Sequence, residues 1–225
     1  MDLMAKLMPS YEENLDSLKR HIEERGLSGK ARVVDLGAGT GIYCELIANL
    51  LPEAEIFHVD FDPAMNAIAK AKYENAGIDN VEVICEHIQR VDFDLASVDL
   101  IVCVNVLYAV QPQNAIAMKM RKWLRSDGSL FIIDFGRKQS ALDWGLHFLT
   151  NAIKGKNIRT YFQFLLFGQQ ITRQALKGRK AQERGEYWVH TTEEFGSFLE
   201  TSGYAVEYVG PCYRGYADLA ICRPS

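Results

Sequence analysis

The stretch that most constrains this chain runs from Arg32 to Gly41 and reads RVVDLGAGTG. A short apolar run with β-branched residues ends at Asp35, and glycines follow at alternate positions, Gly37, Gly39 and Gly41. Such a run predicts a β-strand, and the glycines predict a tight turn that opens a helix. Glycine suits the turn because it adopts positive φ angles without steric cost and lets a ligand approach the backbone. The segment therefore predicts a strand–turn–helix unit with a ligand at its turn.

The spacing of the glycines indicates which ligand the turn can hold. Dinucleotide-binding turns have the pattern GxGxxG, in which the helix N-terminus faces a pyrophosphate. This chain has DxGxGxG, with the Asp35 carboxyl two residues before the first glycine. A carboxylate is poorly placed beside a pyrophosphate but well placed beside a cation. S-adenosylmethionine (SAM) carries an ammonium and a sulfonium and has no phosphate, so the pattern favours SAM over a dinucleotide.

At this motif the sequence resembles the class I (Rossmann-like) SAM-dependent methyltransferases of the small-molecule type, whose first motif has the same form. The resemblance covers about Ser10–Phe135 and Thr191–Arg223 and leaves the segment between them unmatched. It implies SAM as the cofactor, with Asp35 and the three glycines of the turn around its methionine end.

An acidic residue also ends the second predicted strand, Glu55–Asp60. Asp60 stands nineteen residues after Gly41, close to the roughly 20-residue spacing at which an acidic side chain meets a ribose hydroxyl in dinucleotide folds. Its carboxylate can accept hydrogen bonds from both ribose hydroxyls. Asp62 is expected to cap the next helix, which leaves Asp60 free. We therefore predict that Asp60 binds the ribose.

The third predicted strand indicates where the adenine lies. In similar methyltransferases an acidic residue after this strand accepts from the adenine amino group, and the next backbone N–H reaches the ring. The resemblance implies that Glu86, His87 and Ile88 face the adenine edge, with Phe61 and Met65 nearby. The usual Gly-Asp pair of the family is Cys-Glu in this chain, so the acidic side chain is one methylene longer.

Val98–Val104 is a continuous apolar run, as expected of a strand that is buried on both faces. Ligands of open α/β sheets bind beyond the carboxyl ends of the strands. We therefore expect Asn105 beneath the sulfonium and Tyr108 at the pocket, either as a wall or as a base. Methyltransferases acting on adenine or glutamine nitrogens carry Asn-Pro-Pro-Tyr here, and the absence of both prolines argues against that chemistry.

The N-terminal residues 1–30 are expected to form a helical cap on the sheet. Ser10–Arg25 has apolar residues at helical spacing, a capping pair at its start, and Gly26 after its end. This helix either packs only against the sheet edge or brings Tyr11 over the cofactor, as N-terminal segments do in similar methyltransferases.

The remaining pattern predicts how the sheet closes. A helix over Asn114–Arg125 precedes a break at Asp127-Gly128 and a fifth strand. The link between two final strands, Ala205–Val209 and Tyr216–Cys222, is so short that these strands must pair antiparallel. The fold class is therefore α/β, a doubly wound, seven-stranded, mostly parallel sheet with an antiparallel closing strand.

Residues 136–190 interrupt this alternation and predict a helical lid insertion after strand five, within a single methyltransferase domain, 1–225. The insertion is rich in aromatic residues, and 136–186 holds ten Lys or Arg against three Asp or Glu. An aromatic lid excludes water and shapes an apolar pocket. The alternatives are a helix pair that forms a homodimer, a solvated basic face, and a peripheral membrane contact through 177–184.

The predicted cofactor sets the chemistry. Methyl transfer from a sulfonium is an in-line displacement, and it needs a general base only when the acceptor holds a proton. Histidine is the natural base near neutral pH, and His147 and His190 lie in or beside the insertion. These two histidines and Tyr108 are the catalytic candidates, each with an alternative as an ordinary core or surface residue.

We expect a small-molecule methyl acceptor, aromatic or amphiphilic, because the insertion combines aromatic residues with a basic flank. One alternative is a lipid head group or quinone precursor at a membrane surface. Another is a catalytically silent SAM-binding regulatory protein. No nucleic acid is expected, because the positive segment is confined to one insertion whose aromatic residues form apolar helix faces.

The five cysteines show no metal-like spacing, so no metal site is predicted. Their odd number and the lack of a secretory signal favour a reducing, cytoplasmic location. No apolar run reaches about 18 residues without a charge, so no membrane-spanning helix is expected.

Overall fold

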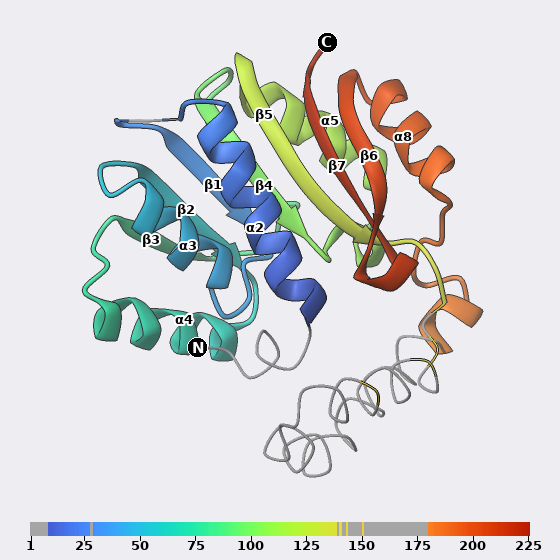
Figure 1. Ribbon diagram of the computed structural model, residues 1–225, viewed down its shortest axis with the longest axis horizontal. Coiled ribbons are helices and arrows are strands. Elements are labelled where there is room, and N and C mark those ends of the chain that lie inside the picture. The colour runs from blue at the N-terminus through green and yellow to red at the C-terminus, as the bar shows by residue number, and fades with distance from the viewer. Residues whose placement is uncertain (1–8, 28, 139, 141–142, 144–149, 151–179) are drawn as a thin grey trace.

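The computed structural model describes residues 9–27, 29–138, 140, 143, 150 and 180–225. Seven strands form one sheet in the order β3-β2-β1-β4-β5-β7-β6 (Figure 1). Neighbouring strands from β3 to β5 are parallel, whereas β7 runs antiparallel to both β5 and β6. This arrangement confirms the predicted doubly wound sheet with its antiparallel closing strand.

The strands are β1 (Arg32–Leu36), β2 (Glu55–Asp60), β3 (Val81–Cys85), β4 (Val98–Val104), β5 (Leu124–Phe135), β6 (Tyr204–Cys212) and β7 (Ala217–Pro224). The helices among the described residues include α2 (Pro9–Glu24), α3 (Ile42–Leu50), α4 (Pro63–Ala76), α5 (Gln113–Trp123) and α8 (Thr192–Thr201). Two short 3-10 helices, η1 (Leu107–Ala109) and η2 (Tyr213–Gly215), follow β4 and β6.

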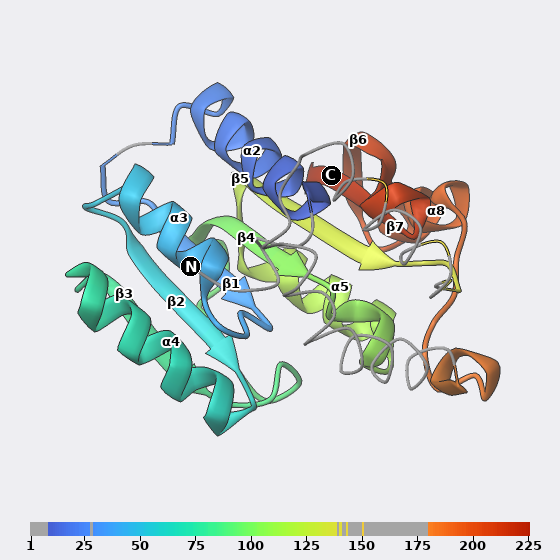
Figure 2. The same ribbon diagram turned by 60° about the horizontal axis from the view of Figure 1, so that its bottom comes forward.

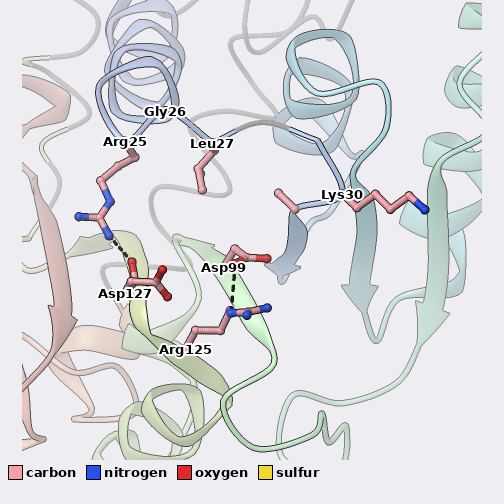
Figure 3. A pocket seen from close by; sticks show the side chains of 8 residues that line it. Arg25, Gly26, Leu27, Lys30, Asp99, Arg125 and Asp127 are labelled. Atoms are coloured by element: carbon pink, nitrogen blue, oxygen red, sulfur yellow. Dashed lines mark hydrogen bonds and ion pairs between the residues drawn. The ribbon is translucent and has the colours of Figure 1, made fainter.

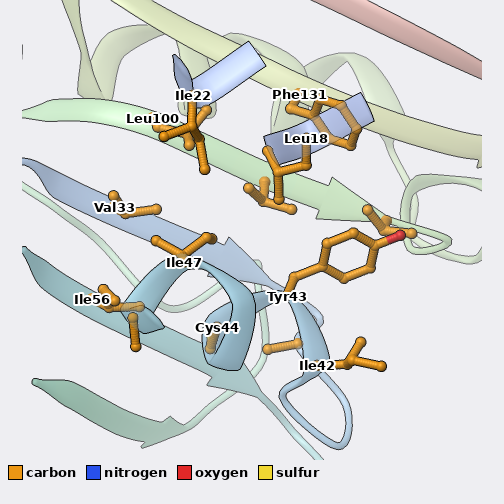
Figure 4. Packing of buried hydrophobic residues seen from close by; sticks show 14 of the residues in the cluster. Leu18, Ile22, Val33, Ile42, Tyr43, Cys44, Ile47, Ile56, Leu100 and Phe131 are labelled. Carbon is orange, nitrogen blue, oxygen red and sulfur yellow. The ribbon is translucent and has the colours of Figure 1, made fainter. Parts of the chain in front are cut away.

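Helices lie on both faces of the sheet (Figures 1 and 2), and an apolar layer fills the space on each face. Helices α2, α3 and α4 pack on one face, and α5 and α8 pack on the other. Strand residues alternate between the layers as the pleat requires, so Val33 joins the first layer and Val34 the second. Figure 4 shows the first layer, in which Leu18 and Ile22 of α2 lie over the sheet beside Ile47 of α3.

The helix ends follow the predicted chemistry. The Asp62 side chain accepts a hydrogen bond from the Ala64 N–H at 2.8 Å and caps α4, which begins with Pro63. Thr191 and Glu194 form the predicted capping box of α8, with reciprocal bonds of 3.2 and 2.8 Å. Each cap satisfies N–H groups that have no partner inside their helix.

Two predicted element boundaries are wrong. Helix α2 already includes Pro9, so residue 10 does not cap it. Helix α5 ends at Trp123 rather than Arg125, because Leu124 already pairs with Val98 in the sheet. Pairing with β4 resumes at Ser129, after a short excursion of β5 that replaces the predicted break.

Gly128 lies in this excursion for a steric reason. A Cβ atom there would lie 2.8 Å from the Val98 carbonyl oxygen, and a real Cβ cannot come so close to backbone. The sequence therefore predicted an irregularity at the correct glycine. Its cause is the close approach of the Gly128 backbone to β4, and not the start of a separate strand.

Much of the predicted insertion, 136–190, lies outside the described residues, as do His147, most of the proposed lid and dimer contact, and the start of 177–184. The single-domain boundaries, the cap 1–30 and the lid 136–190 therefore remain predictions. In the described parts of the chain, no helix is long and apolar enough to cross a membrane.

Candidate functional site

The candidate site lies where the strand order reverses, between β1 and β4. Both strands are parallel, so their carboxyl ends meet at the same edge of the sheet. The glycine turn follows β1 there, and Asn105 follows β4. Ligands of doubly wound sheets bind at such a reversal, which is where the sequence places the cofactor.

Two glycines of the turn are packed tightly from behind. Gly37 has φ +70°, and a Cβ atom there would lie 2.2 Å from a methyl carbon of Val106. Gly41 has φ +74°, and its Cβ would lie 1.9 Å from the Tyr73 hydroxyl oxygen. The N–H of Gly37 also donates to the Val59 carbonyl at 2.8 Å. The turn is therefore held against β2, α4 and the end of β4.

Gly39 has a different environment. Its φ is +55°, but among the described residues a Cβ there would meet only the Gly37 carbonyl oxygen, at 4.0 Å. Its N–H donates to Asp60 Oδ2 at 2.8 Å. Side chains therefore pack tightly against the turn at Gly37 and Gly41, whereas the space beside its middle glycine, Gly39, is open. An open backbone face beside a carboxylate fits a ligand with hydroxyl groups and a positive charge, as SAM has.

Asp60 is not free, contrary to the sequence prediction. Its Oδ2 accepts from the Gly39 N–H and its Oδ1 accepts from the Asp62 N–H, both at 2.8 Å. The carboxylate reaches across the turn because β2 ends directly beside it. Each carboxylate oxygen has a further lone pair, so these bonds fix the orientation of the group and leave acceptor capacity for a ribose hydroxyl.

Asp35 lies beneath the turn and is 1% exposed. Burial raises the pKa of its carboxyl to about 7, while the Cys44 thiol, which donates to Oδ2 at 3.3 Å, and the charge of Asp60 act in opposite directions on it. This carboxyl therefore changes its charge near neutral pH, and a nearby cation would favour the ionised form.

The residues predicted near the adenine gather beside Asp60. Phe61 is 62% exposed and Met65 37% exposed, which is unusual for side chains of this size and fits an apolar ligand surface. The Phe61 and His87 rings stack with centroids 4.9 Å apart. Glu86 Oε1 accepts from the His87 N–H at 2.8 Å, so these two predicted adenine contacts bond to each other. Ile88 is buried.

Asn105 adopts a left-handed conformation, with φ +59°. Its N–H donates to the Ile133 carbonyl at 2.7 Å, which holds it at the end of β4. Asparagine tolerates this conformation better than most residues. Its Oδ1 is buried, with no hydrogen-bond partner among the described residues.

Sequence analysis proposed Tyr11 for the site but missed the two tyrosines that lie beside it in the structure. The Tyr11 ring lies 6.0 Å from the Tyr43 ring and 6.3 Å from the Tyr213 ring, measured between centroids. Burial raises the pKa of Tyr213, and its hydroxyl has no partner in hydrogen-bonding geometry among the described residues. These side chains come from α2, α3 and η2, so no local motif signals their meeting.

Tyr108 lies in η1, directly after β4, and packs among aromatic side chains. Its ring makes edge-to-face contacts with Tyr187, at 4.8 Å between centroids, and with Phe135, at 5.9 Å. Burial raises the pKa of Tyr108 to about 12. The phenol therefore keeps its proton at neutral pH and is unsuited to act as a base.

His190 is buried at the end of β5, 2% exposed. Its Nδ1 donates to the Thr191 carbonyl at 3.2 Å, and its Nε2 lies 3.9 Å from Asp134 Oδ2. Burial lowers the pKa of His190 and raises that of Asp134 well above its usual value. Within the described chain, Nε2 and both Asp134 oxygens have no partner in hydrogen-bonding geometry.

A second carboxylate stands on the other side of His190. Asp218 Oδ2 lies 3.5 Å from His190 Nδ1 and accepts from Arg137 Nη1 at 2.6 Å. Thr192 donates from its hydroxyl to Asp218 Oδ1 at 2.7 Å. This cluster joins β5, β7 and the start of α8, and its members have no spacing in the sequence by which to find them.

A polar hollow of about 480 Å³ lies at the opposite edge of the sheet, near the amino ends of β1 and β4 (Figure 3). Arg25 donates to the Asp127 carbonyl oxygen there, and Arg125 Nε lies 3.6 Å from Asp99 Oδ1. The hollow lies at the other end of the strands from the glycine turn, and its charged side chains have partners of their own. It is therefore not part of the candidate site. No group of side chains suited to hold a metal ion occurs among the described residues.

The sheet order, the glycine turn and the carboxylate beside it define a class I SAM-dependent methyltransferase fold. Residues 33–128 match the family described as a methyltransferase domain. The fold expected from the sequence is thereby confirmed, and the match over residues 33–128 agrees with the expected resemblance to the SAM-dependent methyltransferases.

Individual relatives agree with this assignment. A malonyl-(acyl-carrier protein) O-methyltransferase from Bacillus anthracis is 30% identical over 107 residues, which are 48% of this chain and 38% of that protein. A SAM-dependent methyltransferase from Aquifex aeolicus has a TM-score of 0.62 at 16% identity, covering 98% of this chain and 92% of that one. Phosphoethanolamine N-methyltransferase 2 from Haemonchus contortus, in complex with SAM, has a TM-score of 0.59 at 16% identity. The match covers 89% of this chain and 38% of that one. The chain spans less than half the length of the first curated relatives.

Proposed function

We propose that this chain transfers a methyl group from SAM to a small-molecule acceptor. The observation that carries the proposal is the environment of Gly39, where the turn is open in front and its N–H is bonded to Asp60. A turn that is tightly packed at its outer glycines and open at Gly39 can bind a ligand directly against its backbone. Bound SAM supplies the activated methyl group, while the chain binds and orients the cofactor and the acceptor and excludes water from the site.

The cofactor-binding roles follow from this placement. Asp60 binds the ribose through the lone pairs that its two backbone bonds leave free. The exposed Phe61 and Met65 side chains cover the adenine, and Glu86 accepts from its amino group once the bond to the neighbouring N–H opens. Asp35 acts from beneath the turn as a negative charge for the cationic end.

The acceptor side of the site is apolar and aromatic. Tyr108, Phe135 and Tyr213 form a continuous series of ring contacts, and the two phenols are neutral because burial raises their pKa values. Charge disperses when a sulfonium becomes a thioether, so a low-polarity wall with oriented dipoles suits the reaction. We propose that Tyr108 is a wall of the pocket and that Asn105 lies beneath the sulfonium.

His190 is the proposed proton acceptor for an acceptor molecule that carries a hydroxyl. Its Nδ1–H is held by the Thr191 carbonyl, so the Nε2 lone pair is free to take the proton. Bound SAM would supply the methyl group for the acceptor oxygen, and Nε2, 3.9 Å from Asp134 Oδ2, would hold the proton that the hydroxyl gives up. A pH–rate profile of the wild type and of His190→Gln tests this role.

The acceptor class is proposed from two sources. The name of the Bacillus relative, an O-methyltransferase, supports an oxygen acceptor. The aromatic, partly basic insertion 136–190 supports an aromatic or amphiphilic molecule covered by a lid, or a lipid head group or quinone precursor if 177–184 contacts a membrane.

The test begins with calorimetry of the wild-type chain with SAM and with its product, S-adenosylhomocysteine. Binding of both is expected. A screen of phenols, carboxylates, thiols and amines with a labelled methyl donor then identifies the acceptor atom. Absence of binding to either cofactor form would reject the proposal. Binding without transfer to any acceptor would instead favour a catalytically silent SAM-binding protein.

A further inference from the structure

A buried chain of polar side chains lies behind the glycine turn. At its centre is His58, in the middle of β2 and completely buried. Its Nδ1 lies 2.8 Å from the Tyr73 hydroxyl oxygen, and its Nε2 lies 3.0 Å from Asn66 Oδ1. Both neighbours belong to α4 and are themselves only 4% exposed. His58 therefore has a partner at each ring nitrogen.

The two ends of this chain are backbone groups of the cofactor site. Asn66 Nδ2 donates to the Asp60 carbonyl oxygen at 3.0 Å, and the Tyr73 hydroxyl lies 3.4 Å from the Gly41 carbonyl oxygen. Since the Asn66 amide nitrogen donates to Asp60, its oxygen accepts from His58 Nε2–H. This pattern assigns the ring proton to Nε2, and Nδ1 then accepts the single proton of the Tyr73 hydroxyl. The hydroxyl oxygen therefore meets the Gly41 carbonyl as a packing contact and not as a hydrogen-bond donor.

A second connection joins the same two segments in front, where the Gly39 N–H donates to Asp60 Oδ2 at 2.8 Å. The turn and the end of β2 are thus connected twice, once through the Asp60 side chain and once through His58. The hydrogen bonds behind the turn run from Asp60 through Asn66 and His58 to Tyr73, and the Tyr73 hydroxyl then packs directly against Gly41.

Hydrophobic packing does not explain the presence of His58. Its strand neighbour on the same face, Ile56, is a core residue, and an apolar side chain would fill the position without any need for partners. A buried imidazole costs stability unless its nitrogens are hydrogen-bonded. Fully paired buried networks specify one geometry more strictly than apolar packing does.

We propose that His58, Tyr73 and Asn66 are positioning residues for SAM binding, because they fix the glycine turn relative to Asp60. This inference rests on the proposed function, in which both segments contact the cofactor. The three side chains do not touch SAM in this arrangement. They act through the backbone of Gly41 and Asp60, from behind the surface that the cofactor meets.

The test is calorimetry with SAM and with S-adenosylhomocysteine, combined with thermal unfolding. Tyr73→Phe removes one hydroxyl and keeps the ring, and we expect both dissociation constants to rise roughly three- to tenfold. The matched control is Tyr204→Phe, which removes a buried hydroxyl that donates to the Ala117 carbonyl at 2.8 Å, on the other face of the sheet. The control should lower the unfolding temperature but leave both dissociation constants unchanged.

A second pair of variants provides a conservative rescue. His58→Phe loses both hydrogen bonds, whereas His58→Gln keeps a donor for Asn66, so affinity should fall further in the Phe variant than in the Gln variant. These two His58 variants also test the proposed positioning role if Tyr73→Phe does not fold.

The proposal is overturned if the wild type binds SAM and the folded network variants bind it within twofold of the wild type. It is equally overturned if Tyr204→Phe weakens binding as much as Tyr73→Phe does. A wild type that binds neither SAM nor its product overturns the cofactor assignment itself, which separates the two failures.

Discussion

The edge of the sheet at the carboxyl ends of the parallel strands has two halves, and they differ in how fully their buried polar groups are hydrogen-bonded. In the cofactor half, formed by the ends of β1 and β2 with α4, each carboxylate oxygen of Asp60 and each nitrogen of His58 has a hydrogen-bond partner. In the acceptor half, formed by the ends of β4 and β5 with η2, Asp134, His190 and Tyr213 keep buried polar atoms unpaired within the described chain. An unpaired buried polar group costs about 1–3 kcal/mol. The half that we propose binds the cofactor therefore fixes its geometry through its own hydrogen bonds, whereas the half that we propose binds the acceptor leaves buried polar atoms unpaired among the described residues.

Backbone conformation shows the same contrast. Positive φ angles in the cofactor turn belong to glycines, which adopt them without strain. In the acceptor half they belong to Asn105, Tyr213 and Arg214, where each costs about 1–3 kcal/mol. Strain of this kind is retained where surrounding contacts hold it, and here it brings the Tyr213 ring beside Phe135, at 5.4 Å between centroids.

The largest expected effect compares two glycines of the turn. Gly41→Ala places a Cβ on the Tyr73 hydroxyl at a positive φ, so we expect it to lower the free energy of unfolding by about 2–5 kcal/mol. Gly39→Ala has the same strain but open space in front, so it should cost only about 1–2 kcal/mol while abolishing SAM binding. Denaturant titration and calorimetry measure the two quantities. Equal stability losses in the two variants would contradict the contrast between a packed and an open glycine.

The next effect concerns Asp60. Asp60→Ala removes a charged hydrogen-bond acceptor and should weaken SAM binding by about 1.5–3 kcal/mol, or roughly ten- to a hundredfold, without unfolding the chain. Asp62→Ala is the control two residues away. It removes the α4 cap and should reduce stability by about 0.5–2 kcal/mol with little change in affinity. Unchanged affinity in Asp60→Ala, measured by calorimetry, refutes the ribose assignment.

The pH dependence of SAM binding tests Asp35. Its folded pKa, about 7, lies above the ordinary 3.8, so the ionised carboxylate that favours a cation forms only as pH rises through 7. Affinity should therefore increase roughly eightfold between pH 6 and 7.5 and then level off. The same shift makes the folded carboxyl a source of stability below pH 3.8 that is lost as pH rises toward 7.

Asp35→Asn should bind more weakly and lose this rise in affinity, which calorimetry across the pH range measures. A rise that persists unchanged in Asp35→Asn assigns the titration to another group.

The smallest effect is expected in the acceptor half. Tyr213→Phe removes a buried hydroxyl without a described hydrogen-bond partner, so the free energy of unfolding should change by less than about 0.5 kcal/mol or rise slightly. Tyr204→Phe loses a paired hydroxyl and should cost about 0.5–1.5 kcal/mol. Denaturant titration of the two variants compares them directly. A large loss in Tyr213→Phe would mean that the acceptor half is as fully paired as the cofactor half.

The sequence predicted those parts of the molecule that depend on local pattern. The glycine turn, the cap at Asp62, the capping box at Thr191 and the antiparallel closing strand all follow from residues close together in the chain, and the structure has each of them. Asp60 was found by its distance from the turn, but its two backbone bonds were not, since they depend on how β2 ends beside Gly39.

The acceptor half could not be predicted in the same way. Tyr43 and Tyr213 come from distant elements and each meets Tyr11 only in the folded chain, and Asp218 likewise meets His190 only there. One further signal was present in the sequence: His58 is polar at a strand position where the alternation calls for a core residue. A polar residue in the interior of a buried strand indicates a hydrogen-bond network, although it does not identify the partners.

The attachment of α2 has a consequence for substitutions in its first turn. The His21 ring lies 2.9 Å from the Ser129 hydroxyl of β5, and Leu18 and Ile22 are buried beside it, so the helix is anchored through its second half (Figure 1). Tyr11 is ten residues before His21, about 15 Å along the helix axis, and is the α2 residue that we propose for the site. The attachment and the proposed contact are therefore about three helical turns apart, so substitutions in the first turn of α2 should leave its attachment to β5 unchanged.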